Sequence, residues 1–163
     1  MVARMSGQTT EIRGFDAHDH RACVADALAA AEAKCRAEGL RLTPVRRRVL
    51  EILLESHAAM GAYDILDRLA AEGRGSRPPV AYRALAFLTE HGFAHRVERL
   101  NAFVACARPG ARHEPAFLIC TGCGAVAETT GARPGLGAPA REAGFRIRRT
   151  TVEAEGLCPR CQG

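Results

Sequence analysis

The chain has 163 residues, 47% of them hydrophobic, which suits one ordinary domain or two small ones with a packed core and excludes wholesale disorder. No apolar run approaches the roughly 20 residues that span a bilayer, and the first residues lack the apolar stretch of a secretory signal, so we expect a soluble, cytoplasmic protein. The formal net charge of +5 is compatible with an anionic partner.

The first part of the chain predicts a tail followed by helices. Residues 1–18 have no clear period, and we interpret them as a flexible tail. Thr43 followed by Pro44 is typical of a helix cap and first turn, and Pro78–Pro79 open a later helix. Apolar residues at helical spacing, with glycines as stops, predict four helices, over 19–38, within 40–56, over 62–72 and from 78 to 91.

The pattern changes after the fourth helix. Residues 93–98 and 101–107 are short, rich in aromatic and β-branched residues, and predict a hairpin. Helices followed by a two-stranded wing are typical of a winged helix-turn-helix, whose last helix enters the major groove of DNA. Between Leu40 and Arg108 there are 11 Arg against 7 Asp and Glu, so most of the excess positive charge falls in this part.

A second small domain is expected to follow. We assign residues 19–108 to the winged-helix domain, 109–115 to a linker and 116–163 to an α/β domain. Within the latter we expect strands over 116–120, 125–130 and 145–154 and a short helix over 135–144. The predicted fold class is therefore α+β.

Two Cys-x2-Cys pairs carry the strongest chemical signal. They are Cys120 with Cys123 and Cys158 with Cys161. Zinc prefers four soft ligands at tetrahedral corners, and each pair supplies two of them. Thioredoxin-like redox pairs are the alternative, but such a pair opens a helix after a strand, whereas the first pair here lies between two strands. A reducing compartment also disfavours disulfides, so we predict a structural zinc site.

Four other possible ligands are scattered along the chain: His95, Cys106, His113 and Glu128. Two nitrogens, one sulfur and one oxygen would make an acceptable tetrahedral zinc site, and a hairpin could bring the first two together. Spacing alone gives little support, because a lone histidine is usually a solvated or core residue.

Several motifs together resemble the ferric uptake regulator superfamily, and within it the zinc uptake regulator branch. They are Thr43-Pro44, Ala62-Tyr63-Asp64, PPVAYRALAFLTEHGF and Cys120-x2-Cys123-Gly124, in a match from about Leu40 to Cys161. The resemblance implies a winged helix, a C-terminal dimerisation domain and metal-dependent repression. It also implies that His95, Cys106, His113 and Glu128 bind a regulatory zinc, which makes two zinc ions per protomer.

Departures from the other branches favour zinc. Iron and peroxide sensors usually carry a His-rich run before the first cysteine pair, where this chain has ARHEPAF, and a histidine at the position of Ala59. The thiolate of Cys106 suits zinc better than manganese. We therefore expect a zinc-loaded homodimer that binds a palindromic operator and represses zinc-uptake genes until zinc is scarce, with no membrane or small-molecule substrate as partner.

The regulatory ligands lie on both sides of the linker, so metal would fix the angle between the domains and thereby the spacing of two recognition helices. For DNA contacts we select Arg83, which can grip a guanine, and Tyr63. Tyr82 is as compatible with packing as with contact. Of Arg46, Arg47 and Arg48 we expect at most one to reach phosphate, because a charge run is usually a solvated face.

Other functions stay open at this point. They are a related sensor of iron or peroxide, a thiol redox switch that binds DNA, and an enzyme, either an oxidoreductase or a zinc hydrolase. An enzyme is disfavoured because four cysteine ligands leave no open position for water. His18, His20 and Cys23 could form a third metal site, or be ligand types that occur by chance in a tail.

Overall fold

The protein is described here by a computed structural model that covers residues 14–15, 20–74, 77–110, 113–130 and 135–163. The elements are α1 (His20–Glu38), α2 (Pro44–Leu54), α3 (Ala62–Ala71), α4 (Pro78–Glu90), β1 (Ala94–Val97), β2 (Ala102–Ala105), β3 (Pro115–Cys120), β4 (Val126–Thr130), α5 (Gly137–Glu142), β5 (Val152–Gly156) and the 3₁₀ turn η1 (Pro159–Cys161). None of the helices in these ranges has the length and apolar character to cross a membrane.

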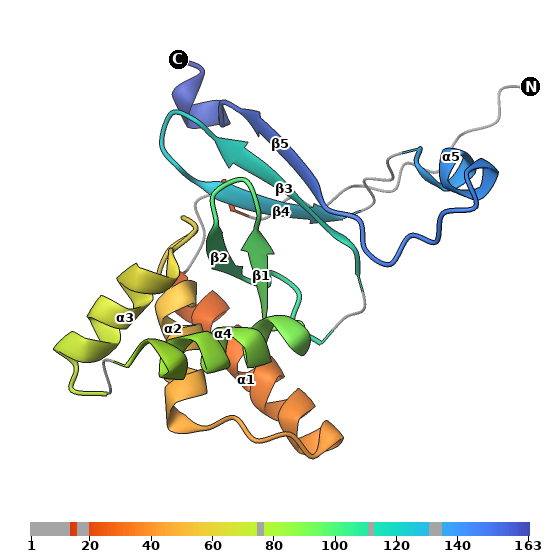
Figure 1. Cartoon of the computed structure of the whole chain (residues 1–163). Coiled ribbons are helices and arrows are strands. Elements are labelled where there is room, and N and C mark those ends of the chain that lie inside the picture. The colour runs from red at the N-terminus through yellow and green to blue at the C-terminus, as the bar shows by residue number, and fades with distance from the viewer. Residues whose placement is uncertain (1–13, 16–19, 75–76, 111–112, 131–134) are drawn as a thin grey trace, which may run out of the picture.

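The four N-terminal helices pack around one apolar core (Figure 1). Thr43 caps α2 by accepting a hydrogen bond from the backbone N–H of Arg46 at 3.4 Å, and Pro44 occupies the first turn. The buried face of α2 includes Val49, Ile52 and Leu53, at the helical spacing seen in the sequence. This packing holds α4 with one face in the core and the other exposed.

The wing, which we define as the β1–β2 hairpin (Ala94–Ala105), follows the helices. Its strands are antiparallel, with Ala94 opposite Ala105 and Val97 opposite Ala102. Met60, in the loop between α2 and α3, extends the wing by exchanging two backbone hydrogen bonds of 2.9 Å with Phe103. The predicted winged helix-turn-helix and the α+β fold class are confirmed.

The C-terminal part is a three-stranded sheet in the order β4-β3-β5, with β3 antiparallel to β4 and parallel to β5. The wing lies between this sheet and the helices (Figure 1). Apolar side chains from both parts form one small core there: Val97 and Val104 from the wing, and Phe117, Ile119 and Val126 from the sheet. The loop after α2 also reaches the sheet, since the N–H of Val126 donates to the carbonyl of His57 at 2.9 Å.

The strand expected over 145–154 is wrong over its first seven residues. Only Val152–Gly156 forms β5, and residues 145–151 have no strand structure. A strand needs a neighbouring strand with which its backbone can pair. None of the described residues of this protomer pairs with that segment, and Phe145 is 67% exposed.

Most of the predicted tail, residues 1–18, lies outside the described residues, but Gly14 and Phe15 are described. Phe15 packs against the cluster formed by Cys120, Ala125 and Cys158. Gly14 is buried at φ +135°, and a Cβ at this position would lie 2.7 Å from the carbonyl oxygen of Val126. Only glycine fits there without displacing the backbone.

Candidate metal centres and DNA-contacting residues

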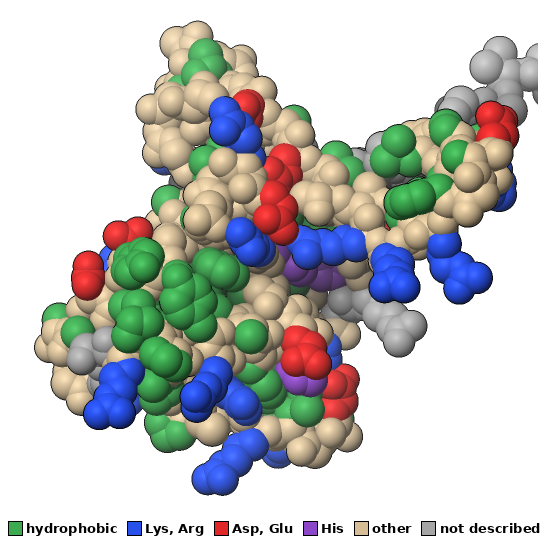
Figure 2. Space-filling model, in the orientation of Figure 1, with side chains coloured by type: hydrophobic (Ala, Val, Ile, Leu, Met, Phe, Trp, Pro, Cys, Tyr) green, Lys and Arg blue, Asp and Glu red, His purple; other side chains and the backbone are tan. Residues whose placement is uncertain are grey.

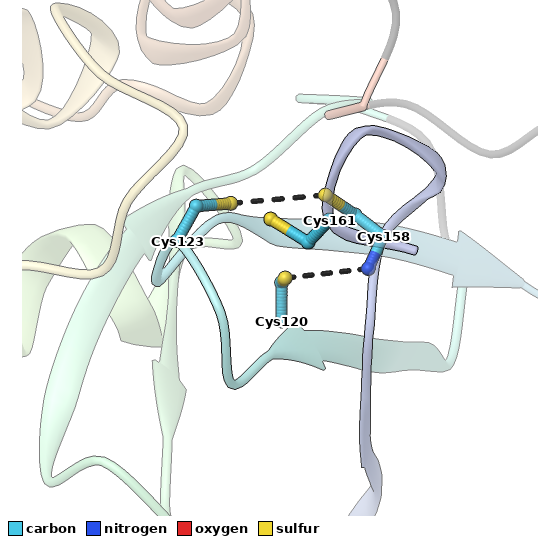
Figure 3. Close-up of side chains that lie close together, drawn as sticks. All are labelled: Cys120, Cys123, Cys158 and Cys161. Atoms are coloured by element: carbon cyan, nitrogen blue, oxygen red, sulfur yellow. Dashed lines mark hydrogen bonds between the residues drawn. The ribbon is translucent and has the colours of Figure 1, made fainter. Parts of the chain in front are cut away.

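The four cysteines of the two Cys-x2-Cys pairs come together at one end of the sheet (Figure 3), and we call this group the four-cysteine site. Cys120 ends β3, Cys123 lies in the following turn, Cys158 precedes η1 and Cys161 ends it. All four sulfur atoms lie within 4.8 Å of one another. The Sγ atoms of Cys123 and Cys158 are 3.7 Å apart. A tetrahedral zinc ion with 2.3 Å bonds separates two sulfur ligands by about 3.8 Å, so the spacing fits zinc.

The local sequence explains how the two pairs approach so closely. A Cβ on Gly122 would lie 3.0 Å from the Sγ atom of Cys161, so a larger residue would push the pairs apart. The backbone N–H of Cys158 donates to Cys120 Sγ at 3.3 Å, and such N–H groups lower the pKa of the Cys120 thiol to about 6. Neighbouring sulfurs raise the pKa of Cys161 to about 12. Four thiolates this close repel one another, and a divalent cation removes that penalty.

His95, Cys106, His113 and Glu128 also converge, with their ligand atoms within 4.8 Å of one another, and we call this group the bridging site. His113 Nε2 lies 3.5 Å from Cys106 Sγ and 2.6 Å from Glu128 Oε1, and His95 Nε2 lies 3.7 Å from the same oxygen. Zinc bonds of ordinary length place a nitrogen and a sulfur ligand about 3.6 Å apart.

The bridging site is buried and has one unsatisfied polar atom. His95 Nε2 is buried without a hydrogen-bond partner among the described residues, which is costly unless something else binds it. Burial lowers the pKa of His95 and so favours the neutral, metal-binding imidazole. Burial, aided by Glu128, raises the pKa of Cys106 to about 12. Glu128 uses Oε2 to accept the N–H of Ala107 at 2.8 Å, which leaves Oε1 facing the histidines. A divalent cation with nitrogen, sulfur and oxygen ligands fits this group.

The ligands of the bridging site come from both parts of the molecule. His95 is on β1, and Cys106 directly follows β2, where its N–H donates to the carbonyl of Phe93 at 2.9 Å. His113 precedes β3, and Glu128 lies on β4 opposite Phe117. An ion bound to all four would therefore tie the wing to the three-stranded sheet. Ala59, where iron sensors carry a histidine according to the resemblance, packs against the apolar core between the two parts.

The two side chains selected for DNA contact are exposed on adjacent helices. Tyr63 is the second residue of α3 and is 72% exposed. Arg83 lies on the exposed face of α4, and no partner for its guanidinium is found among the described residues. Tyr82 is 46% exposed beside it. In Figure 2, positively charged side chains lie beside a group of hydrophobic side chains on the face of the helical part that is in view.

The three consecutive arginines of α2 are all engaged within the protein. Arg46 donates to the carbonyl of Arg41 at 2.5 Å and lies 3.7 Å above the centre of the Phe87 ring. Arg47 pairs with Glu32 and, at 3.0 Å, with Glu51. Arg48 contacts three carboxylates, those of Glu51, Glu55 and Glu72, at 2.7 to 3.1 Å. These contacts favour a role in holding α2 over a role as a phosphate patch.

The possible third metal site is not assembled from described side chains. His18 and the side chain of His20 lie outside the described residues, and Cys23 is half-buried on α1. Among the described residues, groups of three or more metal-binding side chains occur only at the four-cysteine and bridging sites.

Sequence reasoning missed Glu153, which binds the tip of the wing, because no local motif marks it.

Comparison with known proteins bears directly on these sites. The sequence model of the ferric uptake regulator family matches residues 37–152. The zinc uptake regulation protein of Escherichia coli (strain K12) is 41% identical over 139 residues, which cover 82% of this chain and 80% of that protein. A zinc uptake regulator complexed with zinc and DNA is 39% identical, with a TM-score of 0.78 over 85% of this chain and 95% of that one.

Two structures of one further protein, XcZur, differ in how well they match. The holo form is 38% identical, with a TM-score of 0.75 over 84% of this chain and 97% of that one. The apo form covers 87% of this chain and 99% of that one at 37% identity, but its TM-score is only 0.51. At nearly equal sequence identity, this chain therefore resembles the holo form more closely than the apo form. On the match of its family model and of these relatives, the chain belongs to the ferric uptake regulator family.

Proposed function

We propose that this protein is a zinc-responsive transcriptional repressor. The zinc-loaded homodimer binds a palindromic operator in the cytoplasm and represses zinc-uptake genes, and it leaves the operator when zinc is scarce. Each protomer holds a structural zinc at the four-cysteine site and a regulatory zinc at the bridging site. We retain the division into a winged-helix domain (19–108), a linker (109–115) and a dimerisation domain (116–163).

The observation that carries the proposal is the bridging site, whose ligands come from both sides of the linker. Zinc bound there would supply a divalent positive charge shared by all four ligands. His95 and Cys106 hold the wing, whereas His113 and Glu128 belong to the linker and the sheet. These side chains therefore set the angle between the helices that face DNA and the domain that joins two protomers.

The donor sets favour zinc over iron. The four-cysteine site offers only sulfur, and the bridging site includes the thiolate of Cys106, and both suit zinc. The non-polar side chain of Ala59 removes a ligand that the iron and peroxide branches would use. The zinc uptake regulators among the relatives, at 41% and 39% identity, support the same choice.

Operator binding depends on the distance between two copies of α4. In a dimer with two-fold symmetry the recognition helices must meet half-sites about one helical turn apart, roughly 34 Å. Arg83, exposed on α4, is placed to read a guanine, and Tyr63 on α3 to contact a thymine methyl or a phosphate. The protein that resembles this chain with a TM-score of 0.78 binds DNA together with zinc.

Exposed apolar side chains support a homodimer. Leu136, Phe145 and Ile147, which are 51%, 67% and 38% exposed, lie on or beside α5 and the segment that follows it. Figure 2 shows hydrophobic side chains gathered on this part, which projects from the rest of the protomer. A surface of this kind is typical of a protein interface.

A gel shift on a palindromic operator across a series of buffered free-zinc concentrations tests the proposal. We expect binding to appear as zinc rises, with the four-cysteine site loaded throughout. Cys106→Ser should bind operator only at much higher zinc, whereas Cys35→Ala, which removes a buried thiol that belongs to neither site, should behave as wild type. A wild-type protein that binds equally well at every zinc concentration would contradict the proposal.

A further inference from the structure

The tip of the wing is held by a carboxylate of the C-terminal sheet. Glu153, on β5, accepts the backbone N–H of Glu98 at 2.6 Å and that of Arg99 at 2.8 Å, one with each oxygen. Glu98 and Arg99 form the turn that follows β1. These N–H groups would otherwise be free at the end of a hairpin, and a carboxylate that takes both fixes the position of the turn.

Glu153 and Glu128 lie in the same row of the sheet. In the strand register, Phe117 on β3 is opposite Glu128 on β4 and opposite Glu153 on β5. Neighbouring strands are about 4.8 Å apart, so the two glutamates lie about 10 Å apart on the two sides of one phenylalanine. Phe117 packs against Val97 and Val104 of the wing.

The two glutamates of this row therefore contact opposite ends of the wing. Glu128 binds the end near the linker, through the N–H of Ala107 and the histidines of the bridging site. Glu153 binds the opposite end, the turn. The two strands of the wing are paired over four residues each, which couples the position of the turn to that of His95. Holding the turn against β5 thus brings His95, three residues before Glu98, to the face of the sheet that carries Glu128.

Two exposed ion pairs join the same turn to the C-terminal part, among the described residues, but differ from this contact in kind. Arg149 Nη2 lies 3.1 Å from Glu98 Oε1, and Arg99 Nε lies 3.2 Å from Glu155 Oε2. Both join long side chains that are 42% or more exposed, and such pairs contribute little. Glu153 is half-buried and binds backbone, so its two bonds need no long partner side chain to be ordered.

We propose that Glu153 is a positioning residue for the regulatory zinc: by holding the turn of the wing, it prepares the bridging site although it does not itself bind metal. The inference rests on the proposed function of that site. Docking of the turn and binding of zinc favour the same arrangement of wing and sheet. By thermodynamic linkage each therefore strengthens the other, and loss of the turn contact weakens zinc binding.

The test measures zinc affinity of the bridging site in Glu153→Gln, with the four-cysteine site loaded, by competition against a chelator of known affinity. Glutamine keeps the size of the side chain but replaces one acceptor by an NH₂ group that opposes an N–H. We expect the affinity to fall about tenfold, which is about 1.4 kcal/mol. Glu155→Gln is the matched control on the same strand and should stay within about twofold of wild type, because its ion pair is exposed. The zinc of the four-cysteine site should be retained in both variants.

A second measurement needs no variant. Zinc added to the wild-type protein at the bridging site should slow hydrogen exchange of the Glu98 and Arg99 amides, followed by NMR. Unchanged exchange, wild-type zinc affinity in Glu153→Gln, or an equal loss in Glu155→Gln would each overturn the inference. If the wild-type protein takes up no second zinc at all, the proposed function fails, and the role of Glu153 fails with it.

Discussion

Zinc binding at the bridging site should release one proton, from Cys106. Burial raises the pKa of this thiol to about 12, and the residue is only 2% exposed. Zinc binds the thiolate, so at pH 7.5 the proton must leave a group whose pKa is about 4.5 units higher, at a cost of about 6 kcal/mol. His95 adds no proton at this pH, because burial lowers its pKa.

Zinc affinity should rise with pH, because the pKa of the Cys106 thiol is raised. The metal-free thiol stays protonated well beyond pH 8.5. The zinc affinity should therefore rise about tenfold as the pH is raised from about 7.5 to 8.5. A cysteine with an ordinary pKa of about 8.5 would lose this dependence near the top of the range. The shape of the curve thus reports the burial of Cys106.

Calorimetry in two buffers of different ionisation enthalpy counts the protons directly, on protein with the four-cysteine site already loaded. We expect about one proton per zinc in the wild type and in Cys35→Ala, whose missing thiol is buried on α1 and belongs to neither site. Cys106→Ser should bind about 100-fold or more weakly, since loss of a supporting partner alone costs about 10- to 100-fold. A count near zero in the wild type would refute the assignment of Cys106 as a protonated ligand.

Three further outcomes are expected. Arg83→Ala should weaken operator binding by about 1–3 kcal/mol in a fluorescence anisotropy titration, with unchanged circular dichroism; equal affinity would remove this residue from the DNA interface. Thr43→Ala removes the cap of α2 and should lower the free energy of unfolding in urea by about 1 kcal/mol, while zinc affinities stay unchanged. Gly14→Ala places a Cβ 2.7 Å from the Val126 oxygen, so Phe15 should lift from the four-cysteine site and a chelator should remove that zinc faster; an unchanged rate would argue against Phe15 as a cover.

Local chemistry made much of the fold predictable. The start of α2 is marked by Thr43 and Pro44, and the start of α4 by Pro78 and Pro79. Capping residues and prolines act within one turn of the helix, so they can be recognised from the local sequence. The four-cysteine site was also predictable, because two cysteines separated by two residues can bind the same metal ion. The strand expected over 145–154 forms only from Val152 onward, because the residues of a segment do not show whether a neighbouring strand is there to pair with it.

The bridging site was predictable only through the family resemblance. His95 and Glu128 are separated by more than thirty residues, and nothing near either one in the sequence marks it as a ligand. They meet because the wing folds onto the sheet around Phe117. The contact of Glu153 with the wing turn has the same origin. Such long-range contacts depend on how whole elements pack, and single-sequence patterns do not encode them directly.

Small-angle X-ray scattering of the dimer tests most directly whether the bridging site controls the arrangement of the two domains. The four-cysteine site stays loaded, and the bridging site is measured with and without zinc. We expect the zinc-bound dimer to be the more compact state, with wing and sheet arranged as in this structure, and the zinc-depleted dimer to have a larger radius of gyration with unchanged helix content. Identical scattering in the two states would contradict the claim that these four ligands position the DNA-binding helices.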